Sequence, residues 1–365
     1  MRIRSVVLAA ALLLKGDFLF ENGELWRVTY IERMQTIARA AVWHPSEISS
    51  IQIANGPAGG IAVPPETEVT CRYVEPKGKG KGYSPKFLCT LVPSDKLVRV
   101  KFGSGEAHAE AVGTRLLWAL GFYTDHVYPV KLRCLGCPEK NPAHPSVKER
   151  RMDRVFTDTI MEENFAGKEI GEFSDQGWTW NEVDLTDPAR GGATRAQVDA
   201  LKLIAVFMQH TDSKAEQQRL ACYVPFIDRS NGVQKCKKPV LMIQDLGQTF
   251  GKGTREITIE SSMNLNSWKN TPVWSHDCIG NLVSAEFAEE DGLNNPRISE
   301  EGRRFLANLL NQLSDTQIRE LFQVARVGIT GETIEDHGHK RPVNIDDWVA
   351  AFKFKRNQIN DRRCE

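Results

Sequence analysis

Runs rich in β-branched and aromatic residues mark two strands in the amino-terminal third of the chain. They cover residues 67–75 ("TEVTCRYVE") and 86–92 ("KFLCTLV"). The intervening residues, 76–85, are rich in glycine, proline and lysine, a composition typical of loops. The pattern therefore predicts a β-hairpin with a long tip.

A third strand and a helix follow the hairpin. Residues 96–102 alternate apolar and charged side chains, which places Lys101 on the face opposite its two neighbours and lets it face a cleft. Residues 106–120 have apolar positions at helical spacing, and Gly121 stands in the usual carboxyl-cap position. Strand signals resume at 127–133.

The rest of the chain is predicted to be mainly helical. Residues 135–194 are polar and irregular, so they are expected to form a connection with short elements. A strongly apolar helix at 196–209 is followed by two short buried strands, "RLACYV" and "PVLMIQ". Three helices close the chain, at 299–313, 315–327 and 345–355, the second of them behind a capping box.

Composition narrows the class of protein. Hydrophobic residues make up 41% and charged residues 26% of the 365 residues, proportions typical of a globular protein. The 47 lysines and arginines balance the 47 aspartates and glutamates, so no global field attracts nucleic acid or an anionic membrane. We therefore expect no nucleic-acid partner, and the ordinary proportion of hydrophobic residues leads us to expect no transmembrane span.

The amino terminus has the order of a secretory signal. A positively charged start precedes an apolar run from Ser5 to Leu14, as in the n- and h-regions of such signals. This run is too short to span a bilayer as a helix. The nearest small-residue cleavage motif, at 38–40, lies later than usual. The sequence favours export to the periplasm or the extracellular space, and a buried strand or helix is the alternative.

The placement of the eight cysteines also favours export, because disulfides persist in oxidising compartments. Local pairs flank the predicted hairpin, bracket the loop between the two short buried strands, and form a "CLGC" motif: Cys71 with Cys89, Cys222 with Cys236, and Cys134 with Cys137. The alternative for the "CLGC" motif is half of a zinc site or a redox centre.

The segment "HTDSKAEQ", after the apolar helix, resembles the catalytic loop of protein kinases. That loop carries histidine, aspartate, lysine and asparagine at its first, third, fifth and eighth positions. Here these positions hold His210, Asp212, Lys214 and Gln217. Twenty-eight residues after Gln217, "DLG" at 245–247 follows an apolar strand and looks like the magnesium-binding triplet of the same fold.

The upstream elements come in the order of a kinase small lobe, with a glycine-rich hairpin, a strand lysine and a helix glutamate. The resemblance implies that Lys101 clamps nucleotide phosphates and that Glu110, in the helix body, pairs with it. Glu106, at the helix start, is expected to favour the helix dipole instead. The glycines implied to contact the nucleotide are Gly78, Gly80 and Gly82.

The same resemblance assigns the remaining roles. Asp212, beside Lys214, would orient or deprotonate the acceptor, while Gln217 and Asp245 would hold magnesium. The implied cofactors are ATP and Mg²⁺. The implied partners are a nucleotide and a protein, lipid or small-molecule acceptor.

Four features depart from ordinary serine/threonine kinases, one of them "GKGKG" at 78–82 in place of the GxGxxG loop. Gln217 replaces asparagine, Thr211 replaces arginine and Leu246 replaces phenylalanine. In these departures the chain is closer to atypical kinases of bacterial type, the HipA-like and phosphatidylinositol-kinase-like groups. Because glutamine is longer than asparagine, an inactive pseudokinase that binds a nucleotide or a protein stays open. Nucleotidyl transfer to protein on the same fold is a further alternative.

The sequence thus predicts an α+β, protein-kinase-like fold with two lobes. Residues 1–40 would form the export signal and an extension, residues 41–134 a small β-rich lobe with one main helix, and residues 135–365 a larger, mostly helical lobe. The expected activity is ATP- and magnesium-dependent phosphoryl transfer to a hydroxyl group.

Two other groups of residues have simpler interpretations. His337 and His339 stand beside acidic residues, a pattern that can bind a metal, but the surrounding glycine and charges indicate an exposed loop. Trp268 and Trp274, downstream of "DLG", are expected to pack in the core.

Overall fold

The computed structural model describes most of the chain. The described residues are 24–57, 67–75, 84–143, 145, 149–163, 167–172, 177–228, 235–251, 262–285, 288, 290–329, 331–336 and 338–365. The proposed export signal and the glycines Gly78, Gly80 and Gly82 lie outside this part of the chain.

The described elements confirm a mixed α+β fold. The helices are α1 (Tyr30–Ala38), α2 (Gly105–Leu120), α3 (Arg195–Met208), α4 (Leu265–Asn270), α5 (Glu300–Asn311), α6 (Asp315–Val324) and α7 (Ile345–Asp361). The strands are β1 (Glu24–Arg27), β2 (Glu68–Val74), β3 (Lys86–Leu91), β4 (Leu97–Phe102), β5 (His126–Pro138), β6 (Arg151–Glu163), β7 (Gly167–Gly171), β8 (Gln218–Tyr223), β9 (Ile227–Asp228), β10 (Lys235–Cys236), β11 (Pro239–Ile243), β12 (Trp274–His276), β13 (Ile279–Gly280), β14 (Thr333–Asp336) and β15 (His339–Pro342).

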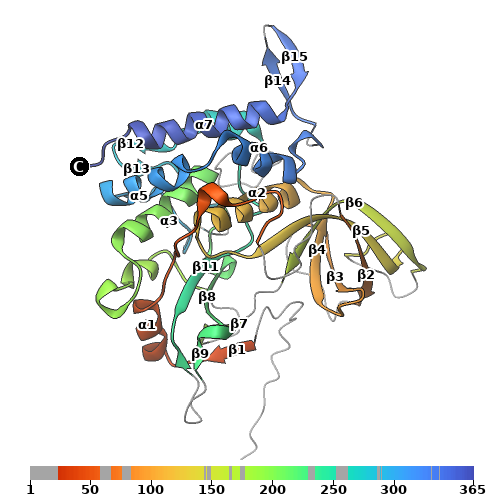
Figure 1. Ribbon diagram of the computed structural model, residues 1–365, viewed down its shortest axis with the longest axis horizontal. Coiled ribbons are helices and arrows are strands. Elements are labelled where there is room, and N and C mark those ends of the chain that lie inside the picture. The colour runs from red at the N-terminus through yellow and green to blue at the C-terminus, as the bar shows by residue number, and fades with distance from the viewer. Residues whose placement is uncertain are drawn as a thin grey trace, which may run out of the picture.

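Five strands close into a barrel in the order β2-β3-β4-β6-β5 (Figure 1). Its interior is apolar because alternate residues of each strand point inward, among them Cys89, Val100, Tyr128 and Met161. Lys101 follows Val100 on β4 and so points out of the barrel, as the alternation predicted. The outer face of β4 therefore carries the charged residues.

β6 corrects the expectation that residues 135–194 form a connection with short elements. This strand has 13 residues and pairs with both β4 and β5. Its first half is mostly solvent-exposed and polar, and only its second half is continuously buried. The strand therefore lacks the alternating pattern by which its neighbours were predicted. The division of the chain into two lobes at residue 134 stays a prediction.

A second sheet and the helices form the other part of the molecule. The sheet has the order β1-β7-β8-β11, and β8 pairs antiparallel with β11. α2 lies between the barrel and the carboxyl-terminal helices α5, α6 and α7 (Figure 1). Trp268 and Trp274 are buried in the large core cluster, as predicted. The three closing helices are present, although α6 ends at Val324 and α7 extends to Asp361.

The region of His339 differs from its prediction as an exposed loop. β14 and β15 pair there as an antiparallel hairpin that projects from the helices (Figure 1). His339 is exposed on this hairpin, and His337 lies outside the described residues. The ion pairs of Arg341 with Asp336 and Asp347 tie the hairpin to the start of α7. Such side-chain pairing across an exposed hairpin has no signal in hydrophobic periodicity.

All eight cysteines form disulfides. The three local pairs follow the expectation, including Cys134–Cys137 of the "CLGC" motif, which is neither a zinc half-site nor a dithiol here. The fourth disulfide, Cys278–Cys364, was not predicted. Disulfides suit an oxidising compartment. Among the described residues, no helix is long and apolar enough to cross a membrane.

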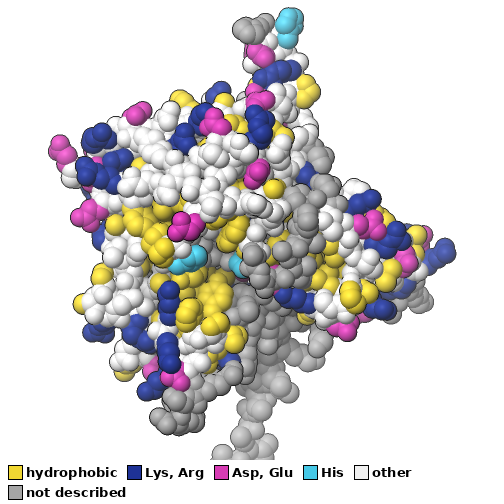
Figure 2. Space-filling view, viewed as in Figure 1, with side chains coloured by type: hydrophobic (Ala, Val, Ile, Leu, Met, Phe, Trp, Pro, Cys, Tyr) yellow, Lys and Arg dark blue, Asp and Glu magenta, His cyan; other side chains and the backbone are white. Residues whose placement is uncertain are grey.

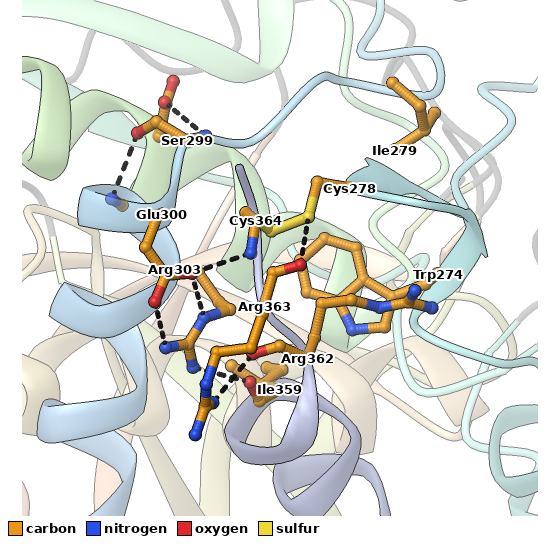
Figure 3. The surroundings of a disulfide bond; sticks show 12 residues. Trp274, Cys278, Ile279, Ser299, Glu300, Arg303, Ile359, Arg362, Arg363 and Cys364 are labelled. Carbon is orange, nitrogen blue, oxygen red and sulfur yellow. Dashed lines mark hydrogen bonds and ion pairs between the residues drawn. A yellow bond between two sulfur atoms is a disulfide. The ribbon is translucent and has the colours of Figure 1, made fainter.

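The Cys278–Cys364 disulfide fixes the carboxyl-terminal tail to the turn between β12 and β13, beside the start of α5 (Figure 3). The backbone N–H of Cys364 donates to Glu300 Oε2 at 2.9 Å. Arg303 donates to both oxygens of Glu300 and also to the carbonyl of Ile359 in α7. The tail, α5 and α7 therefore form one connected network.

Removing this disulfide is expected to cost much more stability than removing Cys134–Cys137. The two bonds close loops with sequence separations of 86 and 3 residues. Loop-closure entropy predicts that replacing both cysteines by alanine lowers the free energy of unfolding by about 4.5 kcal/mol for Cys278–Cys364 and by about 2 kcal/mol for Cys134–Cys137. Chemical denaturation of both variants tests this, and equal losses would contradict it.

Charges are interspersed on the surface. Figure 2 shows lysine, arginine, aspartate and glutamate side chains mixed over one face, as the balanced composition leads one to expect.

Candidate functional site

Lys101 is the centre of a buried ion-pair group where the outer face of β4 meets α2. Its side chain is 2% exposed. The ammonium group donates to Glu110 Oε2 at 2.5 Å and to Asp245 Oδ1 at 3.1 Å. Burial by itself lowers the pKa of Lys101, but the carboxylates of Asp245 and Glu110 outweigh burial and raise that pKa. Lys101 is therefore a fixed cation held between two acids.

Glu110, and not Glu106, is the residue of α2 that contacts Lys101. Burial raises the pKa of Glu110, while the charge of Lys101 opposes this rise. Glu106 instead accepts a hydrogen bond from the side chain of Gln248. Burial and the nearby carboxylate of Asp245 raise the pKa of Glu106. Glu106 thus lies close to Asp245. Its expected role at the helix dipole did not indicate this position.

Asp245 follows β11 and presents its carboxylate to Lys101. Its backbone has φ +50°, in the left-handed region that aspartate tolerates better than most residues. Burial raises the pKa of Asp245, but Lys101 and Lys86 lower it to a net value far below the ordinary range. Its side chain is nevertheless 33% exposed. Asp245 is therefore an ionised acid with an accessible oxygen.

Two glycines let α2 approach the "DLG" triplet closely. A Cβ atom on Gly113 would lie 2.9 Å from Leu246 Cβ, and one on Gly247 would lie 3.1 Å from Glu106 Cβ. Leu246 is fully buried against the helix. A glycine in the middle of a helix costs about 1 kcal/mol relative to alanine. Gly113 was thus a sequence signal for this contact, and it was missed.

The segment from His210 to Gln217 is held in place by distant residues. Trp180 Nε1 donates to the carbonyl of Ser213 at 2.8 Å. The Ser213 hydroxyl accepts from the backbone N–H of Leu293, and the side chain of Asp291 accepts from the N–H of Ala215. His210 is buried, and burial lowers its pKa to about 4, so the ring is neutral at pH 7.

Asp212 is linked to both of the other polar residues of its segment. Gln217 Nε2 donates to Asp212 Oδ2 at 3.0 Å, and Lys214 Nζ lies 3.3 Å from Asp212 Oδ1. Burial and the carboxylate of Asp245 raise the pKa of Asp212 to about 6, against the opposing effects of Lys214 and Gln217. Asp245 is thus near enough to Asp212 for its charge to oppose ionisation of Asp212.

The raised pKa of Asp212 predicts a stability change that depends on pH. A carboxyl whose folded-state pKa lies above its unfolded value favours folding only while it is protonated, and it costs stability as the pH rises through about 6. Asp212→Asn is therefore expected to raise the free energy of unfolding at pH 8 by about 2 kcal/mol and to change it little at pH 4. Thermal unfolding at both pH values tests this, and destabilisation at pH 8 would contradict it.

The donor set suits a hard divalent cation. Such ions prefer carboxylate and amide oxygens. The side chain of Asp245 is 33% exposed, and Asp212 Oδ1 is buried with Lys214 Nζ at 3.3 Å. The amide nitrogen of Gln217 faces Asp212. Asp245 can therefore hold a cation directly, Gln217 would contribute through its amide oxygen, and Asp212 lies beside them.

Most of the predicted site residues are thus brought together. Lys101, Glu110 and Asp245 are in direct contact, and Asp212 is in contact with its two neighbours beside Asp245. Sequence reasoning missed Lys86, which lies directly opposite Lys101 in the β3–β4 register. Lys86 begins the second strand of the predicted hairpin, and this position next to the Lys101 strand could have indicated that Lys86 belongs to the site.

Comparisons with known proteins give limited support. No protein-family model matches the sequence, and no curated protein matches it. Among solved structures, the chain is similar to the Helicobacter pylori proinflammatory kinase CtkA, with a TM-score of 0.41 and 11% sequence identity over 81% of this chain and 96% of that chain. A similarity at this level decides neither the family nor the activity. Membership in the HipA-like or phosphatidylinositol-kinase-like groups stays a prediction.

Proposed function

We propose that the protein is an atypical, kinase-like phosphotransferase that uses ATP and Mg²⁺. The observation that carries this proposal is the position of Lys101 between Glu110 of α2 and Asp245 after β11. In protein kinases a strand lysine, a helix glutamate and the aspartate of the magnesium triplet must all be in place for phosphoryl transfer. The acidic segment with Asp212 beside this group adds support.

Each residue then has a defined part in the reaction. Lys101, fixed by Glu110, would bind phosphate oxygens of the nucleotide, and Asp245 with Gln217 would hold the cation. Mg²⁺, when bound, would neutralise part of the negative charge of the phosphates. Asp212 accepts the proton of the acceptor hydroxyl while that oxygen bonds to the γ-phosphorus and the bond to the leaving ADP breaks. A pKa of about 6 leaves Asp212 mostly ionised at pH 7 and therefore able to take this proton.

Labelled nucleotides separate this function from its alternatives. Incubation with γ-labelled ATP and Mg²⁺ is expected to label an acceptor or the protein itself, and Asp212→Asn is expected to remove that label. Label that arrives only from α-labelled ATP would indicate nucleotidyl transfer. Magnesium-dependent ATP binding without either label, unchanged in the variant, would indicate a pseudokinase.

Export to an oxidising compartment is part of the proposal. The four disulfides and the signal-like amino terminus support it. The acceptor would then be a hydroxyl compound of the periplasm or the extracellular space.

A further inference from the structure

A second group of charged residues lies next to Lys101 on the outer face of the barrel. Arg99 precedes Lys101 by two residues on β4 and so shares its face. Across the β4–β6 register Arg99 is opposite Glu162, and its Nη1 donates to both carboxylate oxygens at 3.0 Å. Glu162 is 2% exposed. This ion pair is therefore largely desolvated and specific in geometry.

The second sheet contributes charges to the same place. Arg219 of β8 pairs with Glu169 of β7 and donates to the side chain of Gln244. Gln244 directly precedes Asp245. Arg219 and Arg99 therefore approach the site from the two sides, one on the sheet and one on the barrel.

Asp125 connects the two ion pairs. It is 2% exposed and interacts electrostatically with Glu162, Arg219 and Arg99. Its Oδ1 has no hydrogen-bond partner within the described residues. A buried acceptor without a donor is unusual. We call Arg99, Asp125, Glu162, Glu169 and Arg219 the charged cluster.

Lys86 is the remaining cation of this face. It stands opposite Lys101 across the β3–β4 register, so both amino groups project from the same face. Burial and the charge of Lys101 lower the pKa of Lys86, while Asp245 opposes that change. No carboxylate of the described residues lies within ion-pair distance of Lys86, in contrast to Lys101, which has two. Its positive charge therefore remains available for an anionic ligand.

A ligand held by Lys101 would extend over the charged cluster, because Arg99 shares the outer face of β4 two residues from Lys101, and this cluster is poorly suited to a selective purine slot. Selective small-molecule sites combine mostly apolar walls with a few fixed polar groups. Covering paired, desolvated charges with a base adds a desolvation cost that does not depend on which base it is. Leu88, opposite Arg99 on β3, and the guanidinium planes can stack on any base. Recognition at this position is therefore expected to tolerate different bases.

We propose that the site recognises the triphosphate of its ligand and not the base, with Lys86 as a second phosphate-binding cation beside Lys101. This inference rests on the proposed function and narrows its donor substrate. The expected donors are nucleoside triphosphates of any base and linear inorganic triphosphate, each as the magnesium complex.

Calorimetric titration with four ligands tests this inference. The magnesium complexes of ATP, GTP, UTP and inorganic triphosphate are expected to bind with dissociation constants within about threefold of one another, since the shared triphosphate carries the charge-assisted contacts. Binding of ATP that is more than about thirtyfold tighter than that of UTP and inorganic triphosphate would overturn it, while leaving the proposed function intact. No binding of any ligand would overturn both.

The variant Lys86→Gln tests the residue itself, with Lys131→Gln as the matched control. Lys131 is an exposed lysine on β5 of the same barrel, 3.6 Å from Glu68. Lys86→Gln is expected to weaken binding of all four ligands about tenfold, as loss of one hydrogen bond from a charged group does, and Lys131→Gln is expected to leave binding unchanged. An unaltered affinity in Lys86→Gln, at an unchanged melting temperature, would overturn the role of Lys86.

Discussion

Asp245→Asn is expected to lower magnesium-dependent phosphoryl transfer by at least about a thousandfold, because it removes the anion that holds the cation against the phosphates. Asparagine has nearly the same shape, so it can still accept from Lys101 through its amide oxygen. The pKa of Asp245 lies far below the ordinary range, so the wild-type group is ionised at every pH used for an assay. The substitution therefore changes charge and leaves size nearly constant.

Transfer of label from γ-labelled ATP measures this effect. The matched control is Asp187→Asn, at an exposed aspartate whose Oδ1 accepts from the backbone N–H of Ala189. Asparagine caps that turn equally well, so the control is expected to keep the wild-type rate. Asp245→Asn protein that retains more than about a tenth of wild-type turnover would show that Asp245 does not hold the metal.

Lys101→Met is expected to cost about 3–5 kcal/mol of stability in addition to abolishing nucleotide binding. The substitution leaves Glu110, which is almost fully buried, without its cation. Breaking one side of a buried pair is strongly destabilising because an uncompensated charge remains. Chemical denaturation of the variant against wild type measures the loss.

The double variant Lys101→Met/Glu110→Leu separates stability from function. Replacing a buried ion pair by apolar residues of similar volume is often neutral or stabilising. The double variant is therefore expected to recover most of the lost stability and none of the nucleotide binding. If the double variant regains nucleotide binding as well, Lys101 has a structural role only.

The parts of the fold that sequence could predict are those with local signals. The β2–β3 hairpin, strand β4 and helix α2 follow from alternation and helical spacing, and the end of α2 follows from Gly121, which has φ +87°. The contact between Lys101 and Glu110 spans nine residues and follows from a strand that leads directly into a helix. By contrast, β6 was missed because its exposed half is polar.

Contacts between distant segments were accessible only where a family resemblance supplied them. Lys101 and Asp245 are 144 residues apart, and the kinase-like order of elements was needed to bring them together. The resemblance did not indicate the contacts of Trp180 and Asp291 with the segment that holds Asp212. It did not indicate the Cys278–Cys364 disulfide either. These contacts and the disulfide are set by tertiary packing, which leaves no periodic pattern in the chain.

The departure at Gln217 has a partial explanation in the structure. Its longer side chain reaches Asp212 and donates a hydrogen bond from Nε2 at 3.0 Å. This contact fixes the orientation of Asp212 relative to Gln217. Gln217 is therefore tied to Asp212, which a glutamine at the asparagine position did not by itself indicate.

Thermal unfolding with ATP, measured with and without Mg²⁺, tests the central claim most directly. A ligand that binds only the folded state, present at a concentration of 100 times its dissociation constant, raises the free energy of unfolding by about 2.7 kcal/mol. The melting temperature then rises by a few degrees. We predict this rise for the wild-type protein with ATP and Mg²⁺ together and its loss in Asp245→Asn. No shift with any nucleotide, or an equal shift in the variant, would contradict a magnesium–nucleotide site at Lys101, Asp212 and Asp245.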